Sequence, residues 1–348
     1  MIWSWSAWLH QSVLRDRPVC LLNLDETSVS FAEARRSGNV VMASKGTLKA
    51  LFYERIARRE THGHLTLVAL LCADASMQPH VPQLLLTKDV GLLVAEKAAL
   101  RRLQPPVFWI LGTDGWVTQD NLPHLLTIIR RHICHHLPHH EIVLLLDCAA
   151  QHVTARVFAH ASRLRMHLLF VPGKTTWLLQ PLDTHVFSLF KRTLHQLQTD
   201  ARAATPDGCL GRSDWVNLLD QAIRQVLVCR TWTHAFEQNG FGGDLTPAAR
   251  ARIYDACNSL VDVTPQAPTD NDLALVFGRR IPNVSRRVLS SALRLQAADA
   301  LALDAGATLV DEALPPLPPP AGPPEESIGD GPISSRTRLR RASSIVDG

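Results

Sequence analysis

The stretch Ile142–Lys191 constrains the fold most, because within it an apolar run leads to an aspartate twice. Ile142–Leu146 end on Asp147, and Leu168–Val171 lead through a Pro-Gly turn to Asp183, with 35 residues between the two acids. Apolar runs of this length, bounded by turn formers, are typical of strands buried on both faces. A carboxylate at the C-terminal end of such a strand lies where open α/β sheets bind their ligands.

A third acid occurs far upstream, where Cys20–Leu24 lead into Asp25. Three acids that each follow a predicted strand indicate a shared site. The alternative interpretation gives them structural roles, with Asp147 and Asp183 as helix N-caps and Asp25 as a turn residue. The positions alone leave both interpretations open.

The order of the predicted elements indicates the fold class. Short strand-like runs separated by turn residues predict an antiparallel meander: Cys20–Leu24, Ser28–Phe31, Asn39–Met42, His64–Ala73, Pro82–Leu86 and Val107–Leu111. The later elements alternate, with helices predicted over 120–133, 153–163 and 183–198 around the two acid-bearing strands. A meander followed by βαβα is the order of an RNase H-like α/β fold, a mixed sheet flanked by helices. Right-handed crossovers then place the Asp147 strand beside the first strand, with Asp25 close to Asp147.

Composition excludes several classes of protein. Seven cysteines occur without a CxxC pair, which indicates neither a zinc ribbon nor a disulfide framework and favours a reducing compartment. No apolar run is long enough to span a membrane, and the first residues lack the basic region of a signal peptide. The net charge of +4 over 348 residues permits a polyanionic partner.

Three converging carboxylates would need a cation. Like charges in a cleft raise one another's pKa unless a cation compensates them. Two Mg²⁺ ions, held by oxygen ligands, could activate a water or a 3′-hydroxyl on one side and stabilise the leaving oxygen on the other, as in-line attack on a phosphodiester requires.

Five motifs carry a resemblance to a known family. They are NLDETSV around Asp25, DGWVT at Asp114–Thr118, LLLDCAAQH around Asp147, PGKTTWLLQPLDTHVFSLFK up to Lys191, and THAFEQNGF at Thr233–Phe241. In this order and spacing the chain resembles the DDE superfamily endonuclease domain of pogo and mariner-type transposases. Domesticated relatives in that family include centromere protein B and jerky-like proteins.

The resemblance implies a function and a set of site residues. It makes Asp25, Asp147 and Asp183 an all-aspartate catalytic triad that binds two Mg²⁺ ions, or Mn²⁺, for DNA strand cleavage and transfer. DNA is the implied partner, with a homodimer suggested and neither a membrane nor a small-molecule cofactor expected. The alternative function is a domesticated, catalytically silent nucleic-acid-binding protein that keeps the transposase fold. A third interpretation is an unrelated α/β protein with capping aspartates.

Three further residues match the family's motifs near the acids. His152 corresponds to the histidine that follows the second aspartate by five residues, and it could contact the scissile phosphate or support the metal ligands. Lys174 and Gln180 lie on the loop before Asp183, where they could contact the DNA backbone or serve only the loop. One position departs from the family, because Cys148 replaces an asparagine that often follows the second aspartate.

The predicted domain organisation has four parts: an N-terminal helical remnant over 1–18, the endonuclease domain over 19–245, a helical extension over 246–304, and a disordered tail over 305–348. The sequence before Asp25 has no room for the helix-turn-helix modules of full-length relatives, so we expect a catalytic domain alone. The tail combines a proline-rich stretch with a basic cluster at Ser335–Ser344. That cluster predicts a nuclear protein in a eukaryote and an intracellular one otherwise.

Three other segments permit a functional interpretation beside an ordinary one. Arg130–His140 contains five histidines and a cysteine, which could bind a transition metal or form a polar helix end. Lys45–Glu60 mixes basic and aromatic residues, as a DNA-contacting segment or a solvated face would. Ser285–Leu303 predicts an amphipathic helix that packs on the domain or contacts DNA.

Overall fold

The computed structural model describes residues 2–14, 17–30, 64–88, 92–112, 115–205, 210–241, 251–252, 255 and 264–277. All of them belong to one compact unit, Met1–Ala307. Several predictions lie outside these residues: the strand Asn39–Met42, the basic segment Lys45–Glu60, Asp114 of the DGWVT motif, the helix Ser285–Leu303, and the proline-rich and basic tail.

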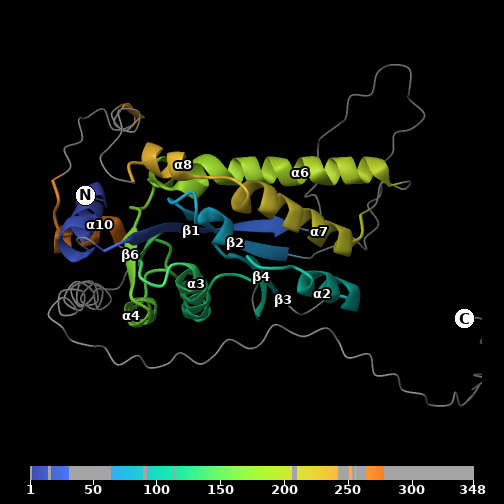
Figure 1. The fold of residues 1–348 in the computed structure, drawn as a ribbon, viewed down its shortest axis with the longest axis horizontal. Coiled ribbons are helices and arrows are strands. Elements are labelled where there is room, and N and C mark those ends of the chain that lie inside the picture. Colours follow the sequence, from blue (N-terminus) through green and yellow to red (C-terminus); the bar gives the residue numbers. More distant parts are fainter. Residues whose placement is uncertain are drawn as a thin grey trace, which may run out of the picture. The chain divides into compact units, whose positions relative to one another are not determined.

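Strands and helices alternate from β2 to β6, and the described elements after β6 are all helical (Figure 1). In order they are α1 (Ile2–Trp8), η1 (Leu9–Leu14), β1 (Val19–Ser30), β2 (His64–Cys72), η3 (Gln78–His80), β3 (Gln83–Lys88), α2 (Val94–Arg101), β4 (Val107–Gly112), α3 (Leu122–His136), β5 (Glu141–Leu146), α4 (Ala155–Arg163), β6 (Met166–Phe170), α5 (Thr176–Leu179), η4 (Leu182–Val186), α6 (Phe187–Ala204), α7 (Arg212–Ile223), η5 (Arg224–Val228), α8 (Thr233–Gln238) and α10 (Asp270–Phe277).

The strands form one mixed sheet in the order β4-β3-β2-β1-β5-β6. Strands β1, β2 and β3 are antiparallel neighbours, whereas β5 and β6 run parallel to β1. This arrangement is a meander followed by two parallel strands with an intervening helix, which confirms the predicted RNase H-like α/β sheet and the placement of the Asp147 strand beside the first strand.

The first strand differs from its prediction. Cys20–Leu24 and Ser28–Phe31 were expected as two strands, but β1 is continuous from Val19 to Ser30. It pairs with β5 only over its first residues, up to Asn23, and with β2 over its remaining length. Because β2 supplies hydrogen-bond partners beyond the end of β5, the chain stays extended through Asp25. This acid therefore lies within a strand and not at its end.

The end of the meander also differs. Strand β4 runs parallel to β3, although an antiparallel neighbour was predicted. Parallel neighbours require a crossover connection, and α2 supplies it. Helix α2 was not predicted, because its eight residues are too few to show a clear helical period.

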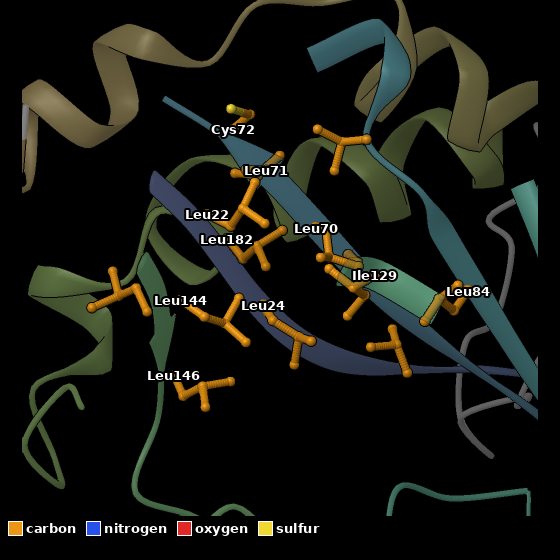
Figure 2. Packing of buried hydrophobic residues seen from close by; sticks show 14 of the residues in the cluster. Leu22, Leu24, Leu70, Leu71, Cys72, Leu84, Ile129, Leu144, Leu146 and Leu182 are labelled. Carbon is orange, nitrogen blue, oxygen red and sulfur yellow. The ribbon is translucent and has the colours of Figure 1, made fainter. Parts of the chain in front are cut away.

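The core lies on both faces of the sheet. Helices α6 and α7 cover one face, and α3 and α4 cover the other (Figure 1). Every residue of β5 and of β6 is buried, as expected for strands between two helical layers. Figure 2 shows part of this cluster, including Leu22 and Leu24 of β1, Leu70 and Leu71 of β2, Leu144 and Leu146 of β5, and Ile129 of α3.

Both ends of the described chain pack on this core. Ile2 and Trp5 of α1 are 3% exposed, and the indole of Trp3 donates to the Asn239 carbonyl. Near the other end, the ring of Phe277 in α10 makes an edge contact with Phe170 of β6. Among the helices that the structure describes, none has the length and apolarity to cross a membrane.

Candidate active site

Two of the predicted acids come together because β1 and β5 are parallel and in register. The last paired residues are Asn23 and Leu145. Two residues further along each strand direction are Asp25, still within β1, and Asp147, just after β5, so both acids lie at the same level of the sheet. Asp25 is 9% exposed, whereas Asp147 lies just beyond the strand end and is half-buried.

The third acid reaches this edge through the turn η4. Leu182 is fully buried, and its backbone amide donates to the side-chain oxygen of Asn23 at 2.9 Å. Asp183 follows directly and is the most exposed of the three acids. Its carboxylate accepts a hydrogen bond from the Thr176 hydroxyl. The buried leucine therefore anchors the turn, and the next residue faces the site.

The charges of neighbouring carboxylates add to a rise in the pKa of two of the acids, Asp25 and Asp183. Burial raises the pKa of Asp25 well above its ordinary value, and the neighbouring charges that add to the rise are Glu26, Asp183 and Asp147. Partial desolvation raises the pKa of Asp183, and the charge of Asp147 adds to that rise. The structure thus gathers all three predicted acids into one electrostatic cluster, with Glu26 as a fourth member.

His152 is fully buried between two carboxylates. Its Nδ1 lies 2.5 Å from Oδ1 of Asp147, and its Nε2 lies 2.8 Å from Oε1 of Glu26. Burial alone would lower the pKa of His152, but the charge of Glu26 and the hydrogen bond to Asp147 outweigh it and raise the pKa to about 10. At neutral pH the ring is therefore an imidazolium that donates both N–H groups.

The same contact fixes the charge state of Asp147. Burial would raise the pKa of this acid, but the hydrogen bond and charge of His152 and the amide of Ala149 outweigh it, so the pKa lies below its ordinary value. Asp147 therefore stays ionised, and its Oδ1 is already engaged by two donors.

The loop before Asp183 places two predicted residues very differently. Lys174 is exposed and has a left-handed backbone, with φ of 67°. Gln180 is fully buried, and within the described part of the chain neither atom of its side-chain amide has a hydrogen-bond partner. Trp177, which lies between them, is 62% exposed and donates from its indole to the Lys174 carbonyl at 3.0 Å. The loop thus presents a cation and an aromatic ring to solvent, and not the predicted glutamine.

The motif at Thr233–Phe241 holds the Asp183 turn from behind. Asn239 is fully buried, and its side-chain amide donates to the Thr184 hydroxyl at 2.9 Å. Next to it, Nε2 of His185 lies 2.6 Å from Oε1 of Gln238. Gly240, with φ of 84°, ends α8 in the left-handed conformation that glycine favours. The motif therefore acts on the site through the residues that follow Asp183.

Cys148, the departure from the family pattern, turns away from the acids. Its thiol donates to the Val171 carbonyl at 2.9 Å, across the gap between the ends of β5 and β6. Burial raises the pKa of this thiol to about 12, and the charge of Asp147 contributes. The side chain is thus a neutral thiol that closes the strand ends.

The donor set fits a hard divalent cation by its chemistry. Asp25, Asp147 and Asp183 offer oxygen ligands only, and burial raises the pKa of Asp25 and of Asp183, so a cation nearby would favour their ionised forms. The three carboxylates are not spaced as in a formed metal site. Within the ranges that the structure describes, no group of three or more His, Cys, Asp or Glu side chains could hold a metal ion. The carboxylates would have to draw closer around a cation.

The histidine-rich segment forms a separate cluster at the end of α3. His136 stacks on His80 with ring centroids 4.4 Å apart, and it makes edge contacts with His132 and His135. Stacked rings turn their faces and not their nitrogens toward one another. The arrangement matches the interpretation of this segment as a polar helix end. Among the described histidines, too, no group of three or more side chains could hold a metal ion.

This cluster predicts a loss of stability in acid. Burial and the nearby His136 lower the pKa of His132 from 6.5 to about 4. A histidine with a lowered pKa destabilises the fold as the pH falls from 6.5 to about 4, because the unfolded chain binds the proton first. Between pH 7 and pH 4 the wild type should therefore lose about 1–2 kcal/mol more free energy of unfolding than His132→Gln loses. Urea unfolding at both pH values measures this. His124→Gln, at an exposed position on the same helix, should behave like the wild type, and an equal effect of the two substitutions would contradict the prediction.

Comparison with known proteins gives a family and a set of structures. A family model described as DDE superfamily endonuclease matches residues 64–239, which include Asp147 and Asp183 but not Asp25. No curated protein matches the sequence.

Among solved structures, the Mos1 transposase paired-end complex with left transposon end has 14% identity and a TM-score of 0.33, and the match covers 63% of this chain and 55% of that one. The Mos1 mariner paired-end complex with Mn has 13% identity, the same TM-score and the same coverage. The chain thus spans about half the length of these two transposase chains. Our assignment of the fold rests on the order and direction of the strands.

Proposed function

Because the chain belongs to the DDE superfamily endonuclease family, we propose that it is a transposase-derived DNA endonuclease and strand transferase that depends on a divalent metal. The observation that carries the proposal is the placement of Asp25, Asp147 and Asp183 at the same end of the paired strands β1 and β5. Burial raises the pKa of Asp25 there, and the charges of Glu26, Asp183 and Asp147 add to the rise. Carboxylates that lie close together disfavour one another's ionised form when no cation is bound. Such a cluster is therefore suited to binding cations.

In this proposal the three aspartates hold two Mg²⁺ ions, for which Mn²⁺ can substitute. The metal supplies activation of a water or a 3′-hydroxyl and stabilisation of the leaving oxygen. Asp147 contributes a carboxylate that stays ionised, because the buried imidazolium of His152 faces it. His152 thereby orients Asp147 and has no ring nitrogen left for a scissile phosphate.

DNA is the proposed substrate. Lys174 and Trp177 are exposed on the loop whose Thr176 bonds Asp183, so a cation and an aromatic face lie close to the acids. A lysine can pair with a backbone phosphate and an exposed indole can stack on an unpaired base. In the conformation seen here, the buried Gln180 is not placed to contact the backbone.

A second candidate function is a catalytically silent DNA-binding protein. The observation that favours it is the engagement of Asp147 Oδ1 by His152 and by the Ala149 amide, which leaves this acid one free oxygen for a metal. In that case the fold would have outlived its chemistry.

A nicking assay on supercoiled DNA with Mg²⁺ or Mn²⁺ distinguishes the two. We expect Asp183→Asn to lower the nicking rate by at least about 100-fold, or roughly 2.7 kcal/mol in the barrier. The matched control is Asp200→Asn, at an exposed position further along α6, which should cut at the wild-type rate. EDTA should stop the reaction. Absence of cutting by a wild-type chain that still shifts DNA in a gel would favour the silent binding protein.

A further inference from the structure

The buried side chain of Asn23 contacts all three of the chain segments that carry the acids. Asn23 lies in β1 two residues before Asp25, on the same face of the strand. Its amide nitrogen donates at 3.1 Å to the carbonyl of Leu145, which lies two residues before Asp147. Its amide oxygen accepts at 2.9 Å from the amide of Leu182, which immediately precedes Asp183.

The two groups that Asn23 contacts lie where the regular hydrogen bonding of their elements ends. The Leu182 N–H is in the first turn of a helix, where amides have no partner within the helix. The Leu145 carbonyl lies where the ladder between β1 and β5 ends. A short side chain that both donates and accepts can satisfy the two at once. Aspartate cannot donate, and an apolar residue can do neither.

A purely structural role is the competing interpretation, and the chain contains an example of it. Gln78 is also fully buried, and its side-chain amide accepts from the amide of Cys72 at 2.7 Å and donates to the carbonyl of Leu227 at 2.6 Å. It ties β2 to η5 and contacts no segment that carries one of the three acids. Asn23 makes the same pair of bonds, but its partners are the neighbours of Asp147 and Asp183.

We propose that Asn23 is a positioning residue that sets the spacing of Asp183 from Asp25 and Asp147 for binding a divalent cation. The inference rests on the proposed function of these acids. Without the Asn23 amide, the η4 turn loses this polar link to the sheet, and the packing of Leu182 that remains on this side tolerates small shifts. The affinity for the cation then falls, because the ligands no longer meet at fixed distances.

The test measures cation binding directly and needs no turnover. Mn²⁺ is titrated into the full chain, and the free ion is followed by electron paramagnetic resonance. We expect Asn23→Ala to weaken Mn²⁺ binding by about 10-fold or more, with faster hydrogen exchange at the amides of 182–184. Gln78→Ala should lower the melting temperature about as much as Asn23→Ala does. Its affinity for Mn²⁺ and its hydrogen exchange at 182–184 should stay at the wild-type values. Asn23→Ser, whose single hydroxyl on a shorter side chain cannot reach both the Leu182 amide and the Leu145 carbonyl, serves as a milder second variant if Asn23→Ala does not fold.

The outcomes separate the inference from the function on which it rests. Wild-type affinity for Mn²⁺ in Asn23→Ala or Asn23→Ser would overturn the role of Asn23 while leaving the metal site intact. An equal loss of affinity in Gln78→Ala would also overturn it, because general destabilisation would then explain the effect. If the wild type binds Mn²⁺ no better than Asp183→Asn does, the metal-dependent function is wrong and the role of Asn23 is wrong with it.

Discussion

Replacing His152 with alanine is expected to lower the free energy of unfolding by about 3 kcal/mol. The imidazolium is the only group that we find between the carboxylates of Asp147 and Glu26 in the described structure, and it bonds both of them from a fully buried position. Its removal leaves two negative charges facing a cavity. Unfolding in urea at pH 7, followed by circular dichroism, measures the difference.

Two further variants make this result specific. Adding Glu26→Gln to His152→Ala should recover part of the loss, because one of the two uncompensated charges is then absent. His160→Ala is the matched control, because His160 is half-buried and its ring contacts the Thr127 hydroxyl and the Arg163 side chain but no carboxylate in the described structure. It should cost about 1 kcal/mol or less. Equal losses for His152→Ala and His160→Ala would show that the bridge between the carboxylates contributes little.

The sequence could predict the acids because strand direction and apolar runs are local signals. The run Ile142–Leu146 is buried throughout and ends beside Asp147, as expected of a central parallel strand. The position of Asp25 within β1 could not be predicted in this way, because it depends on β2 extending further along β1 than β5 does. Pairing of this kind is set by segments far apart in the sequence.

Two residues of the site were missed, although the sequence carried a signal for each. Asn23 interrupts an otherwise apolar strand, and a buried amide must find partners. Glu26 follows Asp25 directly, and alternation along a strand places it on the opposite face, where His152 lies. Gln180 shows the opposite case: its position on a loop left open a contact with DNA or a role in the loop alone, and the fold buries it.

At the opposite end of β5, the charge of Glu141 is expected to contribute about 2 kcal/mol to stability at pH 7. Its Oε1 accepts from Arg17 at 3.2 Å and from Arg165 at 2.5 Å, and its Oε2 lies 3.5 Å from Nε2 of His167. Burial alone would raise the pKa of Glu141, but His167 and Arg165 outweigh it and lower the pKa from 4.5 to about 2. That difference corresponds to roughly 3 kcal/mol, which we reduce because the Arg165 side chain is 45% exposed.

The sign of the pH dependence follows from the lowered pKa. A carboxylate of this kind stabilises the fold above its unfolded pKa, and this contribution is lost as the pH falls from 4.5 toward 2. Glu141→Gln should therefore be about 2 kcal/mol less stable than the wild type at pH 7, and the gap should narrow steadily below pH 4.5. Asp220→Asn, which breaks a more exposed pair with Arg224, should cost at most about 1 kcal/mol. If the difference in free energy of unfolding between the wild type and Glu141→Gln were the same at pH 3 as at pH 7, lost packing and not the charge of Glu141 would explain it. In that case the placement of Arg17, Arg165 and His167 would not depend on the charge of the carboxylate that they surround.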